Sequence, residues 1–263
     1  MLLAIDVGNT NIVLGVFDGD QLRWSWRLAT QRERTSDELG IMVAELFAHA
    51  GLPRERIGGI ILSSVVPPLT RPAIQMCRQY WKMEPLVVDP ATNAGMPVRY
   101  DPVSDVGADR VVNAVAAYEL YGRSRQVPVI AIDFGSGTTF DAITRDGTYV
   151  GGVIVPGIQI SADALFQRAA RLPRVDVRKP PSIIGRTTVT SMQAGLFFGY
   201  VSMVDGIVHR MRAELAAGDR AICVATGGMA DVMASEMSAV QRVEPDLTLQ
   251  GLRLIWERNS SKP

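Results

Sequence analysis

The sequence predicts two similar α/β halves, each a mixed sheet with helices, and a cleft between the halves. Three observations lead to this fold class. The chain has 263 residues, of which 47% are hydrophobic, so it can form one large domain or two of ordinary size with a substantial core. A strand motif near the N-terminus recurs near the middle of the chain. Helices and strands alternate after each copy, which is typical of α/β sheets.

The recurring motif is an apolar strand that ends in Asp-x-Gly. Residues 3–8 read Leu-Ala-Ile-Asp-Val-Gly and residues 130–135 read Ile-Ala-Ile-Asp-Phe-Gly, with Asp6 and Asp133 about half the chain apart. Each copy continues with a polar turn, β-prone residues and an Asp-Gly pair, which is typical of a hairpin. Five matched residues can arise by chance, but the matched hairpin favours a duplication. We therefore expect halves at residues 1–118 and 119–263.

The first half continues from its meander into helices and strands. Trp24, Trp26 and Leu28 alternate with polar residues, which predicts a half-buried strand over 22–28. Ser36 is the expected N-cap of the next helix. The further elements expected here are a helix over 36–50, a buried strand over 58–64, a helix near 69–81, a short strand over 86–88 and a helix over 105–121.

The second half repeats this alternation. Its expected elements are a strand over 149–153, helices over 156–171 and 188–217, a strand over 221–225, a helix after Gly227-Gly228, a helix over 246–258 and a frayed tail over 259–263. The long helix carries an apolar stripe that includes Gly199, and Gly195 lies on the same helix. The two glycines suggest close approach by another backbone, which a partner subunit could supply.

Composition limits the partners. The chain has 27 basic and 27 acidic residues and no block of like charges, which argues against nucleic acid as a partner. No apolar run approaches the roughly 20 residues of a membrane helix, and the N-terminus looks like a first strand rather than a signal peptide. Cys77 and Cys223 have no metal or redox spacing and are expected to be buried thiols. We expect a cytoplasmic protein with no membrane partner.

The first candidate site is the loop 6–11, Asp-Val-Gly-Asn-Thr-Asn. Glycine permits a tight turn, Thr10 and Asn11 offer donors for phosphate oxygens, and Asp6 could hold Mg²⁺ directly or through water. A plain hairpin with polar turn residues fits this copy equally well. The second copy, Asp133 followed by a Gly-Ser-Gly turn, favours the functional interpretation. Two such loops facing each other across a cleft could hold a polyphosphate.

Other site classes find little support. The chain has no GxxxxGK[ST] loop, and 135–137 lacks the third glycine of a dinucleotide fingerprint. Its two histidines lie in no motif, and Ser63-Ser64 lacks the turn of a hydrolase nucleophile. Thr226-Gly227-Gly228 would let a flat ring such as adenine lie against the backbone, although a plain strand-to-helix turn is the commoner explanation. The remaining chemistry is phosphoryl transfer with carboxylates, Mg²⁺ and a phosphate site.

The last candidate is Gly107-Ala108-Asp109-Arg110, near the start of a helix. Sequence neighbours do not face each other on a helix, so Asp109 and Arg110 form no intrahelical ion pair. An arginine and a helix N-terminus should keep Asp109 ionised and able to accept a proton from a substrate hydroxyl. Arg110 could bind a carboxylate or a phosphate. A capped helix with solvated charges explains the spacing equally well.

Together these motifs resemble those of type III pantothenate kinases, over residues 2 to about 256. The matching segments, in order, are DVGNTN at 6–11, GADR at 107–110, DFGSGTTFD at 133–141, GRTTVTSMQAG at 185–195 and TGG at 226–228. The family belongs to the superfamily of acetate and sugar kinases, Hsc70 and actin. The resemblance implies duplicated ribonuclease H-like (actin-like ATPase) domains with mixed five-stranded sheets. It also implies ATP-dependent phosphorylation of pantothenate to 4'-phosphopantothenate, the first step of coenzyme A biosynthesis.

The resemblance also implies site roles and a homodimer with active sites at the subunit interface. Asp109 corresponds to the general base, Asp133 to the ligand of a monovalent cation (K⁺ or NH₄⁺), and Asp6 to an indirect support of Mg²⁺. The positions implied in ATP binding are Asp6, Val7, Gly8, Asn9, Thr10, Asn11, Ile12, Val13 and Ser136. Those implied in pantothenate binding are Tyr100, Gly107, Ala108, Asp109, Arg110 and Thr188.

The chain departs from the family pattern twice. The second phosphate loop usually reads Asp-Phe-Gly-Thr-Ala-Thr-Thr, whereas Ser136 and Gly137 stand here, which we expect to weaken ATP binding and leave the chemistry intact. The usual Lys-Asn-Thr is Arg186-Thr187-Thr188 in this chain, which leaves open which threonine meets the substrate.

Two other functions stay open. One is a transcription accessory or regulatory protein on the same fold, against which the intact Asp6, Asp109 and Asp133 argue. The other is a different small-molecule kinase, against which the GADR segment argues.

Overall fold

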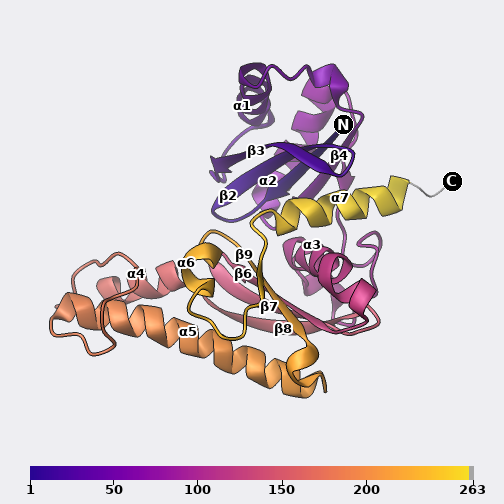
Figure 1. Ribbon diagram of the computed structural model, residues 1–263. Helices are drawn as coiled ribbons and strands as arrows, with labels where there is room; N and C mark the ends of the chain where they lie inside the picture. The colour runs from indigo at the N-terminus through magenta and orange to yellow at the C-terminus, as the bar shows by residue number, and fades with distance from the viewer. Residues whose placement is uncertain (261–263) are drawn as a thin grey trace. The chain divides into compact units, whose positions relative to one another are not determined.

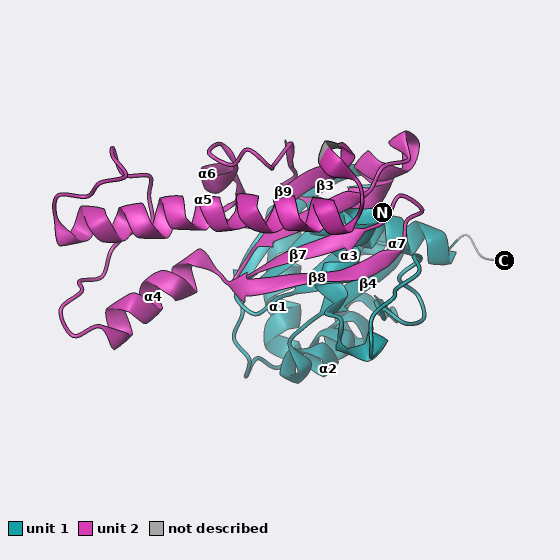
Figure 2. Ribbon diagram, turned by 90° about the horizontal axis from the view of Figure 1, so that it is seen from below, with its two compact units in different colours: residues 1–116, 247–263 teal, residues 117–246 magenta. Residues whose placement is uncertain are grey.

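The structure is a computed structural model that describes residues 1–260 and comprises two compact units (Figure 2). Unit 1 contains residues 1–116 and the C-terminal helix α7 (Leu247–Ser260), and unit 2 contains residues 117–246. The chain passes from unit 1 to unit 2 after residue 116 and returns to unit 1 at residue 247. The sequence places helix α7 in the second half, whereas it packs on strands of the first unit.

The sheet of unit 1 has five strands in the order β3-β2-β1-β4-β5. The strands are β1 (Leu2–Val7), β2 (Asn11–Asp18), β3 (Gln21–Ala29), β4 (Gly59–Ser64) and β5 (Leu86–Val87). β1, β2 and β3 form an antiparallel meander, whereas β4 is parallel to both β1 and β5. In this register Asp6 pairs with Ser63 of β4 and with Val13 of β2. The sheet is therefore mixed and five-stranded, as expected.

Helices pack on both faces of this sheet (Figure 1). On one face, Ile5 and Val7 belong to a core shared with α1 (Ser36–His49) and α2 (Pro67–Met76). On the other face, α7 packs so closely that any side chain at Gly59 would meet Trp256. Helix α3 (Ala108–Ala117) lies against α7, since a side chain at Gly251 would meet the backbone of Val112. Because strand residues alternate between faces, Asp6 belongs to the face of α7 and α3.

The sheet of unit 2 repeats this arrangement with the order β8-β7-β6-β9-β10. Its strands are β6 (Val129–Phe134), β7 (Gly137–Ile143), β8 (Tyr149–Pro156), β9 (Ile222–Thr226) and β10 (Arg242–Val243). Strand directions match those of unit 1 pair by pair. Asp133 pairs with Thr226 of β9 and with Thr139 of β7, just as Asp6 pairs with Ser63 and Val13. The duplication read from two short motifs thus extends to the whole sheet.

Three helices accompany the second sheet: α4 (Ile158–Arg168), α5 (Thr188–Glu214) and α6 (Ala230–Ala234). Helix α5 runs along the unit in Figure 1, and its apolar stripe packs on β6 through residues such as Phe197, Val204 and Val208. A small satellite cluster joins α4 to the first turns of α5 and includes Ala162 and Met192.

Several element ends differ from those expected. Helix α1 is capped by Thr35 rather than Ser36, because Glu38 stands three residues after Thr35 and completes a capping box with it. Helix α2 begins at Pro67, since proline at the first helical position lacks only an N–H that the helix does not use. Strand β10 was not expected. Helix α7 continues through Ser260, so of the expected tail 259–263 the last three positions lie outside the described residues.

The expected burial of both cysteines is confirmed. Cys77 and Cys223 are free, buried thiols, and burial raises the pKa of each to about 12. No helix within residues 1–260 is long and apolar enough to span a membrane.

Candidate active site

The first phosphate-loop candidate is a short turn fixed by its own backbone. The N–H of Gly8 donates to the carbonyl of Asn11 at 3.0 Å. Thr30, at the end of β3, holds the turn from outside: its hydroxyl donates to the Gly8 carbonyl at 2.7 Å and its N–H to the Thr10 carbonyl at 2.9 Å. Asn9 and Thr10 are exposed at the tip. No sequence pattern points to Thr30, which is distant along the chain and belongs to no motif.

The GADR segment comes to the same edge of the sheet as Asp6. The N–H of Val65, just after β4, donates to the carbonyl of Val7 at 3.0 Å. The side chain of Val65 lies beside Gly107, because a Cβ at Gly107 would stand 3.5 Å from Cγ1 of Val65. Strands β1 and β4 are parallel, so their carboxyl ends meet here. The fold therefore gathers Asp6 and the start of α3 within unit 1.

Gly107 makes room for the candidate base. A Cβ at this position would stand 2.5 Å from Oδ1 of Asp109, so only glycine leaves the carboxylate its place. Oδ1 of Asp109 accepts a hydrogen bond from the N–H of Arg110 at 2.7 Å. The carbonyl of Gly107 accepts from the same N–H at 3.1 Å. The GADR spacing thus folds one carboxylate back over the first turn of α3.

Burial is the main influence on this carboxylate. It raises the pKa of Asp109, and the N–H and guanidinium of Arg110 offset only part of that rise. We expected Arg110 to help keep Asp109 ionised; it does lower the pKa, but desolvation of the charged form is the larger effect here. A carboxylate with a raised pKa is a better proton acceptor, which suits a general base.

The other residues assigned to substrate in unit 1 lie close along the chain. Arg110 is 6% exposed on α3, more buried than a solvated helix-surface arginine would be. Tyr100 is partly buried in the segment that precedes α3. The alternative of a merely solvated Asp-Arg pair therefore does not describe these side chains.

The second loop lies at the matching edge of the sheet in unit 2. Gly227 has φ +94°, and a Cβ there would stand 2.4 Å from Oδ1 of Asp133. Glycine is required at this position, and the Thr-Gly-Gly backbone passes directly beside the Asp133 carboxylate. The carbonyl of Ser136 accepts from the N–H of Gly157 at 3.0 Å, at the junction of β8 and α4. Asp133, Ser136 and Gly227 therefore form one local constellation.

Thr188 lies elsewhere in unit 2, as the first residue of α5. Thr187 is the N-cap of that helix, and its hydroxyl bonds to the N–H and the hydroxyl of Thr190 at 3.2 and 2.9 Å. Both threonines are exposed, but the cap occupies the hydroxyl of Thr187. Thr188 and Arg186 line a shallow groove together with Leu165 and Met192.

Comparison with known proteins identifies the chain. The type III pantothenate kinase model matches residues 2–210. The chain is 54% identical to the type III pantothenate kinase of Geobacter sulfurreducens, over 98% of this chain and 99% of that protein. It is 51% identical to the enzyme of the same name from Moorella thermoacetica, over 99% of this chain and 100% of that protein. This chain belongs to the type III pantothenate kinase family.

Solved structures of low identity share the fold. One is a protein described as a Baf family transcriptional activator from Campylobacter jejuni, with a TM-score of 0.61, 17% identity and coverage of 99% of this chain and 100% of that one. Another is the ROK hexokinase from Thermus thermophilus, with a TM-score of 0.52, 15% identity and 99% coverage of both chains. Such similarity shows the actin-like kinase fold alone, so the first of these lends no support to a transcriptional role.

Kinases of this family use ATP with a divalent metal, and the oxygen donors of this chain suit one. Within residues 1–260 no group of three or more His, Cys, Asp or Glu side chains could hold a metal ion. A divalent metal that is bound by one or two carboxylates together with substrate phosphates needs no such group. Asp6, with a buried serine hydroxyl beside it in the register, offers such a limited set of oxygens.

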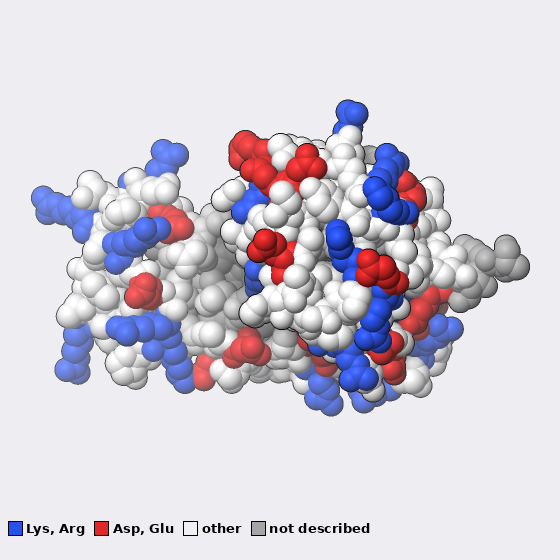
Figure 3. Space-filling model, turned by 90° about the horizontal axis from the view of Figure 1, so that it is seen from above, with Lys and Arg blue, Asp and Glu red and all other residues white. Residues whose placement is uncertain are grey.

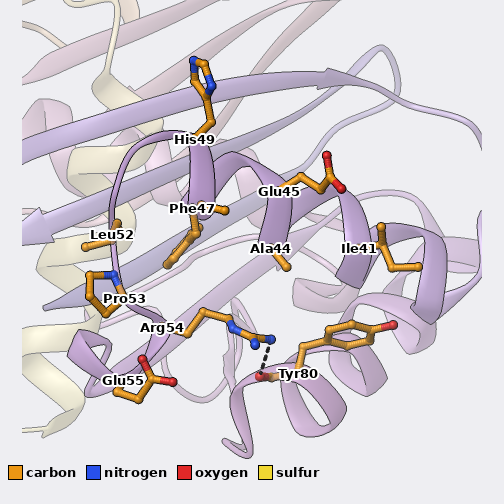
Figure 4. Close-up of a pocket in the computed structure, with 11 residues that line it drawn as sticks. Ile41, Ala44, Glu45, Phe47, His49, Leu52, Pro53, Arg54, Glu55 and Tyr80 are labelled. Carbon is orange, nitrogen blue, oxygen red and sulfur yellow. Dashed lines mark hydrogen bonds between the residues drawn. The ribbon is translucent and has the colours of Figure 1, made fainter.

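A separate groove in unit 1 lies on the outer side of α1 (Figure 4). Ile41 and Tyr80 stand on one side of it, and Arg54 donates from Nη1 to the carbonyl of Tyr80 at 3.5 Å. None of the residues assigned to ATP or pantothenate lines this groove.

Proposed function

We propose that this chain phosphorylates pantothenate with ATP, giving 4'-phosphopantothenate, the first step of coenzyme A biosynthesis, and that Asp109 is its general base. The observation that carries the proposal is that the chain belongs to the type III pantothenate kinase family. The geometry agrees with it, because Gly107 leaves room for the Asp109 carboxylate at the sheet edge where Asp6 lies, and burial raises the pKa of that carboxylate.

The proposed step is a direct phosphoryl transfer. The primary hydroxyl of pantothenate attacks the γ-phosphorus of ATP while Asp109 accepts the hydroxyl proton. The new oxygen–phosphorus bond forms, the bond to the β-phosphate oxygen breaks, and ADP leaves with that electron pair. Arg110 and Tyr100 orient pantothenate, together with Gly107, Ala108 and Thr188. Thr188 is favoured over Thr187 because the helix cap already uses the Thr187 hydroxyl.

The phosphates of ATP are assigned to the loop Asp6–Val13 and to Ser136. Both turns are fixed by hydrogen bonds to neighbouring strands, so their donors are preorganised. Mg²⁺, when bound, neutralises phosphate charge, and Asp6 supports it indirectly. Asp133 binds a monovalent cation, K⁺ or NH₄⁺, and the backbone of Gly227 passes beside its carboxylate.

We also propose a homodimer. Large apolar side chains are exposed on α4 and before α5, among them Phe166 at 44% and Ile184 at 77%. At Gly195 and Gly199 no atom of the described residues stands within 4 Å of a Cβ position. A backbone that approaches these glycines would then come from another copy.

The cytoplasm is the proposed location, because two buried free thiols suit a reducing compartment. Neither a nucleic acid nor a membrane is a proposed partner. In support, the chain carries 27 basic and 27 acidic residues, and groups of both signs lie on the face drawn in Figure 3.

The deciding experiment is a coupled assay of ADP release with and without pantothenate, first in K⁺ and then in Na⁺. We expect ADP release that requires pantothenate and is faster in K⁺. Release that does not depend on pantothenate would point to another acceptor, and the absence of turnover would reject the kinase assignment.

A further inference from the structure

A buried serine hydroxyl next to Asp6 has no protein partner. Ser63 of β4 is 0% exposed, and its Oγ makes no hydrogen bond to any of residues 1–260. An unmet buried hydroxyl costs free energy, so native proteins seldom keep one without a reason. A group that arrives on ligand binding would supply that reason.

The strand alternation shows where this hydroxyl lies. Ile60 and Leu62 belong to the core shared with α1 and α2, so Ser63 belongs to the opposite face of β4. That is the face of Asp6, which is the register partner of Ser63 on the adjacent parallel strand. Adjacent strands are about 4.8 Å apart, so side chains of such a pair are direct neighbours.

The next serine provides a contrast. Ser64 belongs to the α2 face, and its hydroxyl is hydrogen-bonded to the hydroxyl of Thr70 at 2.7 Å. It also accepts from the N–H of Val66 at 3.4 Å. The two adjacent serines therefore differ in their hydrogen bonds. The hydroxyl of Ser64 is bonded at the start of α2, whereas that of Ser63 has no hydrogen-bond partner among the described residues.

Unit 2 repeats the position. Thr226 of β9 is 2% exposed and is the register partner of Asp133. In each unit a buried hydroxyl thus stands beside the aspartate at the end of the central strand, although the surrounding residues differ. The repetition argues that the hydroxyl belongs to the site rather than to an accident of packing.

We propose that Ser63 is a positioning residue for nucleotide binding: its hydroxyl donates to the Asp6 carboxylate when the magnesium complex of ATP is bound. This inference rests on the proposed role of Asp6. A hydrogen bond to a carboxylate is charge-assisted and directional, so it fixes the carboxylate that serves the metal. In the free chain the buried Ser63 hydroxyl has lost its contact with water and has no hydrogen bond to the described residues. It gains the bond to Asp6 when the magnesium complex of ATP binds.

The test compares Ser63→Ala with Ser64→Ala, which remove the same atom from opposite faces of one strand. Calorimetric titration measures the affinity for ATP with Mg²⁺ and with EDTA, and thermal unfolding measures Tm without ligand. We expect Ser63→Ala to weaken Mg-ATP binding about tenfold, as for loss of a hydrogen bond to a charged group. Its affinity for metal-free ATP should be unchanged and its Tm should not fall. Ser64→Ala should lower Tm and leave Mg-ATP affinity unchanged.

Three results would overturn the inference: unchanged Mg-ATP affinity in Ser63→Ala, an equal loss with and without metal, or a Tm loss as large as that of Ser64→Ala. A Ser63→Ala chain that does not fold counts with the last, since the hydroxyl would then support the fold. Turnover of the unmodified chain separates the two proposals. If that chain phosphorylates pantothenate while Ser63→Ala binds Mg-ATP normally, only the role of Ser63 fails.

Discussion

The two units share a sheet and differ in what surrounds the central aspartate. In both, the aspartate stands near the end of the central strand and pairs with a hydroxyl residue on the parallel neighbour. Next to Asp6 the chain brings the start of α3, with Asp109 folded over Gly107. Next to Asp133 it brings the bare backbone of Gly227. Each sheet thus places a carboxylate at the same position, and the loops and helices around it differ in the groups that they bring near it.

The turns after the two aspartates are fixed in different ways. The turn after β1 is held by Thr30 of its own meander, and its tip is exposed. The turn after β6 is held by Gly157, at the entry to α4, and the hydroxyl of Thr138 is bonded to Tyr200 of α5. The second turn is therefore connected to α4 and to α5, the helix that carries Thr188. A change in α4 or α5 can reach the turn after β6, whereas Thr30 of the meander holds the turn after β1.

The largest expected effect comes from the group that only unit 1 has. Asp109→Asn should lower kcat by about 10²–10⁴-fold, the usual contribution of a positioned base. Binding of Mg-ATP should be unchanged, since the phosphate loops are untouched. Steady-state kinetics and titration of both substrates measure this, and near-full turnover by the variant would contradict the assignment.

The raised pKa of Asp109 fixes the sign of its pH effects. The carboxylate must be ionised to accept a proton, so kcat/KM should fall with decreasing pH through a pKa above the ordinary aspartate value. The folded state binds this proton more tightly than the unfolded state does. The free energy of unfolding therefore falls as pH rises from the ordinary aspartate pKa through the raised pKa of the folded state. Asp109→Asn removes that penalty and should raise Tm at neutral pH, measured by thermal unfolding at several pH values.

A smaller effect is expected at the matching aspartate of unit 2. Asp133→Asn should abolish the stimulation by K⁺, about tenfold in kcat/KM, which corresponds to about 1.4 kcal/mol. The dependence on Mg²⁺ should not change, because Asp6 serves that metal. Assays across K⁺ and Mg²⁺ concentrations test the division of labour. A shift in the Mg²⁺ dependence instead would mean that the two carboxylates share one ion.

The sequence predicts the duplicated sheet well because its signals are local. Strand-end aspartates, Asp-Gly turns and helical stripes are each readable within about ten residues. It failed where packing decides: α7 returns to the first unit through contacts such as Trp256 with Gly59, which no local pattern encodes. The same holds for the site. Motifs made Asp6 and Asp109 candidates, whereas no local pattern points to Thr30 or to Ser63, whose hydroxyl has no hydrogen-bond partner among the described residues.

The smallest expected effects concern the capping boxes that begin α1 and α5. Thr35→Ala and Thr187→Ala each remove a side-chain cap and should lower the free energy of unfolding by about 1 kcal/mol. Only the second should raise KM for pantothenate, because its cap fixes the first turn that carries Thr188, whereas α1 carries no assigned substrate residue. Denaturant unfolding and substrate titration separate the two effects. If both variants raise KM equally, general loosening is the cause, and the cap of α5 has no particular part in substrate binding.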